Sequence, residues 1–111
     1  MIEITFNAEE LSLRVEGHAG QADKGQDVVC SAVSTLFWTL AKSLLCLEDT
    51  LTEGVKIEAE SGAGEICCRP KDEYLANVSV IFWTILNGFE GVADTYPEYV
   101  KLNIIEKGEK K

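Results

Sequence analysis

Two side chains able to do covalent chemistry stand twelve positions apart: His18, the only histidine in the chain, and Cys30. An alternating, strand-like segment ends just before His18, and a helix is predicted to begin just before Cys30. An imidazole can take the proton of a thiol and return it to a leaving amine, and the thiolate is then a nucleophile. The two residues therefore predict a thiol active site with Cys30 as nucleophile and His18 as proton carrier.

The residues around Cys30 suggest how its thiol is activated. Asp27 is a favourable N-cap, so we expect a helix over residues 28–47 with Cys30 in its first turn. Unpaired amides and the positive end of the helix dipole favour a thiolate there, and these amides, including that of Cys30, are candidates to stabilise an oxyanion. Asp27 is alternatively expected to orient His18. Ser34 lies one turn after Cys30, and its hydroxyl bonds either within the site or back to the Cys30 carbonyl.

Three glycines, Gly17, Gly20 and Gly25, accompany the segment between His18 and Cys30. They permit unusual backbone angles and close approach of the chain. Residues 19–26 are therefore predicted to form a lid loop that closes over substrate, or else an ordinary flexible connection. The spacing matches neither a dinucleotide-binding fingerprint nor a P-loop, so a phosphate site is not expected.

The remaining cysteines, Cys46, Cys67 and Cys68, are expected to be small buried hydrophobic residues. No C-x-x-C occurs, so neither a zinc site nor a redox pair is indicated, and we expect no metal and no cofactor. A thiol redox protein with Cys30 as its reactive group remains an alternative, although it lacks an obvious resolving cysteine.

Hydrophobic periodicity predicts how these residues are positioned. Alternating segments indicate five half-buried strands, and two longer apolar segments indicate helices. The strands are predicted over residues 2–6, 11–16, 55–60, 65–69 and 100–104, and the helices over residues 28–47 and 72–93. The order ββαββαβ predicts an α+β domain with two layers, a five-stranded mixed sheet covered by two helices. We expect residues 1–111 to form one domain.

Composition narrows the range of partners. With 19 acidic and 10 basic side chains the net charge is −9, which disfavours direct nucleic-acid binding. A cationic protein or peptide would be attracted, although an acidic surface can also serve solubility alone. Neither a signal peptide nor an apolar run long enough to cross a membrane is recognised, so a cytoplasmic location without membrane attachment is expected.

Both predicted helices are apolar on more than one side. A helix that only covers a sheet needs a single apolar stripe. The additional surface is expected either between the two helices or against a second copy of the chain, and we favour a homodimer.

The strings Gly17-His18-Ala19-Gly20 and Asp27-Val28-Val29-Cys30-Ser31-Ala32-Val33-Ser34 make a specific resemblance visible. At this separation they resemble the paired motifs of the ribosomal-processing cysteine protease family, Prp, and the likeness extends over the whole chain. The resemblance implies His18 and Cys30 as catalytic residues, with Gly17, Asp27 and Ser34 as supporting residues.

The resemblance also implies a reaction: a homodimeric cysteine endopeptidase removes the N-terminal extension of bacterial large-subunit ribosomal protein twenty-seven, as ribosome maturation requires. The partner implied is thus the precursor of a cationic ribosomal protein. A non-catalytic ribosome-assembly interaction protein is the other alternative that the acidic surface and apolar helices leave open.

Overall fold

A computed structural model describes residues 1–17 and 24–106, without the side chains of residues 24–27. The elements follow the predicted order ββαββαβ, with two short 3-10 helices at Glu48–Thr50 and Asp72–Tyr74. The strands and helices are β1 (Ile2–Asn7), β2 (Ser12–Glu16), α1 (Lys24–Leu45), β3 (Lys56–Glu60), β4 (Ala63–Cys67), α2 (Leu75–Thr95) and β5 (Val100–Ile105).

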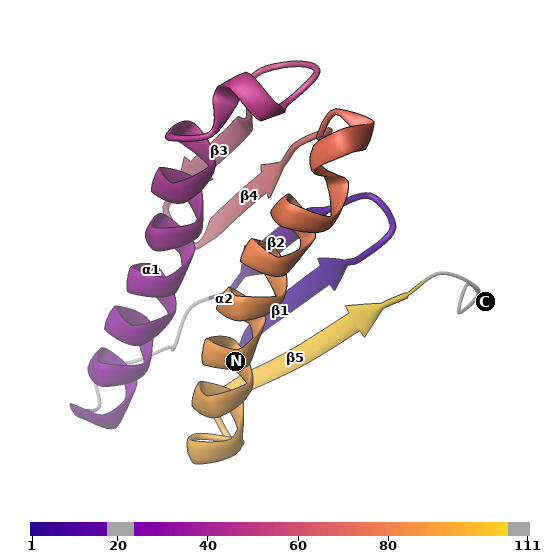
Figure 1. The fold of residues 1–111 in the computed structure, drawn as a ribbon. Coiled ribbons are helices and arrows are strands. Elements are labelled where there is room, and N and C mark those ends of the chain that lie inside the picture. The colour runs from indigo at the N-terminus through magenta and orange to yellow at the C-terminus, as the bar shows by residue number, and fades with distance from the viewer. Residues whose placement is uncertain (18–23, 107–111) are drawn as a thin grey trace.

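The five strands form one mixed sheet in the order β3-β4-β2-β1-β5. Strand β1 is parallel to β5, whereas the other neighbouring pairs are antiparallel. Both helices lie on the same face of this sheet, and the opposite face carries no helix (Figure 1). The predicted two-layer α+β fold is therefore confirmed.

The core lies between the sheet and the helices. Alternate strand residues such as Ile4, Phe6 and Leu13 are fully buried beneath the helices, as the sequence pattern predicts. The rings of Phe6 and Phe82 stack with centroids 5.5 Å apart and join β1 to α2. Each such side chain stabilises the fold by about 1.5–3 kcal/mol through burial, so the sheet is a firm base for any site at its edge.

The start of α1 differs from the prediction. The helix begins at Lys24, so Asp27 is its fourth residue and Cys30 its seventh. Asp27 is therefore not the N-cap, and Gly25 belongs to the helix rather than to a lid loop. The prediction failed because a carboxylate is favourable inside the first turn as well as at the cap. A glycine inside a helix lowers its stability by at most about 1 kcal/mol relative to alanine, so Gly25 is compatible with a helix that begins at Lys24.

The inward pattern predicted for the third strand is only partly correct. Val55 and Ile57 are half-buried, but Ala59 is exposed although it occupies the same face of the strand. Strand β3 lies at the edge of the sheet. The helix layer does not close over Ala59, because a cavity lies between α1 and this part of the sheet.

Both helices are long and apolar enough to cross a membrane by length and composition alone, over Val28–Leu45 and Asp72–Thr95. The prediction that no apolar segment is long enough to cross a membrane is therefore not met by these two helices. Core helices of folded domains often meet the same criterion, and one face of each helix here is buried against the sheet.

Candidate active site

Cys30 is exposed on α1, beside a cavity of about 370 Å³. The cavity lies between this helix and the sheet, and it is open to solvent. Residues of α1 form one wall, the end of β2 forms another, and the hairpin of β3 and β4 forms the third. A nucleophilic thiol here has free access to a peptide chain from outside, which a buried cysteine would not have.

Gly17 also lines this cavity, directly after β2. Its φ is +105°, and a Cβ at this position would collide with the carbonyl oxygen of Met1. Its N–H donates to the carbonyl of Gly62 in the neighbouring hairpin, with 2.8 Å between N and O. Only glycine fits without strain, and its conformation determines the direction in which the chain leaves the sheet toward residue 18.

His18 and Gly20 lie outside the described residues, and so does the side chain of Asp27. The roles predicted for them remain predictions. The structure brings together three of the predicted site residues, because Gly17, Cys30 and Ser34 all line the same cavity.

Ser34 follows Cys30 by one helical turn. Thr35 and Thr39 donate their hydroxyls to the carbonyls four residues earlier. Within the part of the chain that the structure describes, Ser34 makes no such bond to Cys30. The alternative in which the Ser34 hydroxyl bonds back to the Cys30 carbonyl is therefore wrong. Ser34 is exposed and lines the cavity.

The earlier start of α1 also changes which amides can stabilise an oxyanion. Amides beyond the first turn bond to the carbonyl four residues earlier, so that of Cys30 is already used within the helix. The expectation that it serves as a donor was wrong. The amides that have no carbonyl four residues earlier in this helix are those of the first turn, which begins at Lys24.

Aromatic side chains form the apolar part of the cavity. The ring of Phe37 lies over Gly64 of β4, where an added Cβ would come within 2.8 Å of the ring. Trp38 packs edge-on against Phe37, with ring centroids 5.1 Å apart and planes at 84°. Trp38 is itself 52% exposed at the cavity. The cavity is thus suited to a large apolar side chain next to the reactive thiol.

Four residues that line this cavity were not predicted from the sequence: Phe37, Trp38, Ala59 and Gly64. Ala59 is a small residue at an inward position of a predicted strand, but Gly64 lies outside the strand predicted over residues 65–69, which in the structure begins at Ala63. Ala59 and Gly64 are paired directly in the sheet. Small side chains at paired inward positions leave space beneath a covering helix.

The other cysteines differ from Cys30 in their surroundings. Cys68 is buried, and desolvation raises the pKa of its thiol to about 11. Burial, and then the nearby Glu65 carboxylate, also raise the pKa of the half-buried Cys67. Both thiols therefore stay protonated and unreactive near neutral pH.

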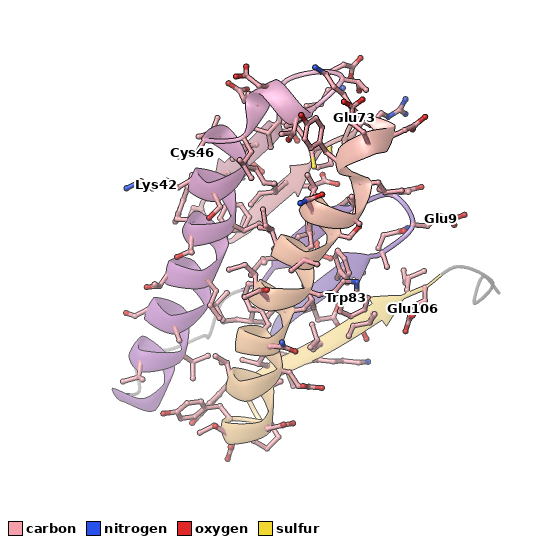
Figure 2. All side chains as sticks on the ribbon, in the orientation of Figure 1. Glu9, Lys42, Cys46, Glu73, Trp83 and Glu106 are labelled. Carbon is pink, nitrogen blue, oxygen red and sulfur yellow. The ribbon has the colours of Figure 1, made fainter. Side chains whose placement is uncertain are left out.

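Cys46 is exposed, contrary to the prediction that it is buried. It follows the last residue of α1 and lies near that end of the helix, beyond Lys42, which points away from the fold (Figure 2). A cysteine just past a helix end is not covered by the sheet, which explains the difference. It lines none of the cavity beside Cys30. Across residues 1–17 and 24–106, no group of three possible metal ligands lies close together.

Comparison with known proteins agrees with this site. The family model described as cysteine protease Prp matches residues 1–101. No curated protein matches the chain. A solved structure, SMU.848 from Streptococcus mutans, is 28% identical over 96% of this chain and 93% of its own, with a TM-score of 0.70.

Two structures from S. aureus have the same fold. Both are described as an essential ribosomal processing protease Prp, one with a substrate peptide and one with a covalently linked product peptide. They are 23% and 24% identical, with TM-scores of 0.70 and 0.69, and each match covers 93% of this chain and 96% of theirs. An exposed cysteine beside an apolar cavity, together with the family match over residues 1–101, places the chain in the Prp family of cysteine proteases.

Proposed function

We propose that this cysteine protease removes the N-terminal extension from the precursor of bacterial large-subunit ribosomal protein twenty-seven. The observation that carries the proposal is the position of Cys30, exposed at a cavity that also contains Gly17, the residue directly before His18. The family assignment supports proteolysis in ribosomal processing. The identity of the substrate follows from the sequence resemblance.

Cys30 and His18 carry out the chemistry in this proposal. The Cys30 sulfur attacks the carbonyl carbon of the scissile bond after its proton passes to His18. His18 gives that proton to the leaving amine as the C–N bond breaks, which leaves a thioester on Cys30. Water, deprotonated by His18, then cleaves the thioester to a carboxylate and restores the thiol. First-turn amides of α1 stabilise the oxyanion in both halves of the reaction.

The apolar cavity selects the substrate residue that precedes the scissile bond. Its floor, Phe37 on Gly64, lies on the same side of α1 as Val33 and Ser34. A large apolar side chain placed there would bury its surface against Phe37 and Trp38. Burial of one such side chain contributes about 1.5–3 kcal/mol to binding. A side chain held there positions the neighbouring carbonyl of the scissile bond near Cys30.

The open face of the sheet supports a cationic substrate. The register places Glu3 directly opposite Glu16, and Glu58 directly opposite Glu65. Like charges at opposite positions destabilise a sheet, although Lys101 lies opposite Glu3 and Arg14 opposite Glu65 on the other neighbouring strands. Arg14 pairs with Glu16 at 3.4 Å and offsets only part of this charge. The face and the net charge of −9 attract the basic body of a ribosomal protein.

The proposal includes a homodimer in the cytoplasm. Exposed apolar side chains remain on both helices, at 55% for Val28, 49% for Leu45, 51% for Leu75 and 62% for Val80. Contact with a second copy would bury such side chains. Sedimentation equilibrium at micromolar concentration should give twice the chain mass, and a mass of 12.2 kDa would contradict the dimer.

The substrate assignment is tested with the purified chain and the extended ribosomal protein twenty-seven. Mass spectrometry should find two products, the extension and the mature protein, with a single new N-terminus. The matched control is the same ribosomal protein without its extension, which should remain intact. Persistence of the extended protein, or cleavage of both proteins alike, would contradict the assignment.

A further inference from the structure

The strand beside the cavity has an open edge. In the described sheet β3 is the terminal strand, and β4 is its neighbour. An edge strand presents backbone N–H and C=O groups that a second extended chain can pair with. The other edge belongs to β5, on the far side of the sheet from β3 and its cavity.

The register determines which backbone groups face this edge. Residues Ser61 and Gly62 form a two-residue turn between Glu60 and Ala63, which are paired. A hairpin of this kind closes on a hydrogen-bonded pair, and such pairs alternate with non-bonded ones. Glu60 and Glu58 therefore bond to β4. The N–H and C=O groups of Ala59 and Ile57 point away from β4, toward the open edge.

Ala59 connects this edge with the candidate active site. It lines the cavity that Cys30 also lines, and the residue is exposed. A small side chain leaves the passage from the edge to the cavity open. A peptide paired with Ala59 would consequently have its next residues within reach of the apolar floor formed by Phe37 and Gly64.

We propose that the substrate binds as an additional strand along β3, with the segment before the scissile bond paired to the backbone of Ala59 and Ile57. This rests on the proposed function, because the occupant is the extended N-terminal segment of the ribosomal protein precursor. Peptide recognition by strand addition obtains affinity from main-chain hydrogen bonds and specificity from alternate side chains.

Such a strand places its side chains alternately on the two faces of the sheet. Side chains on the helix side enter the apolar cavity. Those on the other side lie next to Glu58 and Glu60, which are exposed on the helix-free face. The geometry therefore selects an extended segment in which an apolar residue alternates with a neutral or basic one, and it disfavours acidic residues on the open side.

Backbone methylation of the substrate tests this binding mode with the unmodified enzyme. A peptide that spans the extension is prepared in versions with one N-methyl amide each, at successive positions before the scissile bond. Amides that pair with β3 recur at every second residue, so kcat/KM should fall about tenfold or more at alternate positions and change little between them. Equal effects at neighbouring positions, or no effect, would overturn the proposal.

A variant pair tests the same bonds from the enzyme side. Ala59→Pro removes the outward N–H, which an edge position tolerates, whereas Ala59→Ser keeps it at similar size. We expect kcat/KM for the peptide to fall about tenfold in the proline variant and less than threefold in the serine variant. If Ala59→Pro does not fold, the N-methyl series decides alone.

The possible failures are distinguishable. If the wild-type chain cleaves no version of the peptide, the proposed function is wrong and this proposal falls with it. If it cleaves all versions at similar rates, only strand addition is wrong. If Ala59→Pro instead converts a dimer into a monomer in sedimentation, the edge is occupied by a second copy, which also overturns the proposal.

Discussion

The ring of Phe37 in α1 lies directly on Gly64 in β4, and no other residue type at position 64 would leave this ring where it is. A Cβ there would come within 2.8 Å of two ring atoms. The contact determines the depth of the cavity beside Cys30, because Phe37 forms its floor. A glycine in a strand normally weakens it, so its presence here serves close packing.

Replacing this glycine should destabilise the protein and distort the cavity. We expect Gly64→Ala to lower the free energy of unfolding by about 1–3 kcal/mol, because the ring must move within a packed layer. Gly91→Ala is the matched control, since a Cβ at Gly91 meets nothing within 4 Å and alanine favours a helix. Urea unfolding of both variants measures the difference. A Gly64→Ala variant as stable as the wild type would contradict this packing.

Trp38 should affect substrate binding more than stability. It is 52% exposed beside the cavity, so Trp38→Ala should change the free energy of unfolding by less than about 1 kcal/mol. The same change should lower kcat/KM for the extension peptide about tenfold, since the substrate side chain loses an apolar wall. The control is Val80→Ala, because Val80 is 62% exposed on α2 and lies outside this cavity. Similar kcat/KM losses in both variants would argue against a substrate pocket.

Stability at alkaline pH should depend on Cys68. Burial raises the pKa of its thiol to about 11, so the folded state holds this proton more tightly than the unfolded chain. Well below pH 9 both states are protonated and the group has no effect. As pH rises from about 9 to 11 the unfolded state ionises first, and stability falls. Between pH 9 and 11 the free energy of unfolding of Cys68→Ala, measured by urea unfolding, should fall by about 2 kcal/mol less than that of the wild type. Parallel losses would contradict a protonated, buried thiol.

The sequence predicted the fold well because periodicity reflects burial directly. Ile4, Phe6 and Leu13 alternate with polar residues, and each is buried as that alternation requires. The two helices and five strands occur in the predicted order, although β4 spans Ala63–Cys67 and the strand was predicted over residues 65–69. The helix start was missed because Asp27 suits the first turn and the cap equally well, so residue type alone does not locate the boundary.

The candidate site was only half visible in the sequence. Cys30 and Gly17 could be found from their types and spacing, and they do meet in one cavity. The cavity itself depends on how α1 crosses the hairpin of β3 and β4. The contact of Phe37 with Gly64 joins residues 27 positions apart, and no local pattern encodes it. The same tertiary packing leaves Ala59 exposed where alternation predicts burial.

The central claim is that Cys30 is the nucleophile, and the most direct measurement compares Cys30→Ala with Cys46→Ala. Both thiols are exposed, but only Cys30 lines the cavity. Each variant is incubated with the extended ribosomal protein twenty-seven, and product is quantified by mass spectrometry. We predict no detectable cleavage by Cys30→Ala and wild-type cleavage by Cys46→Ala. Cleavage by Cys30→Ala at the wild-type rate would contradict the account.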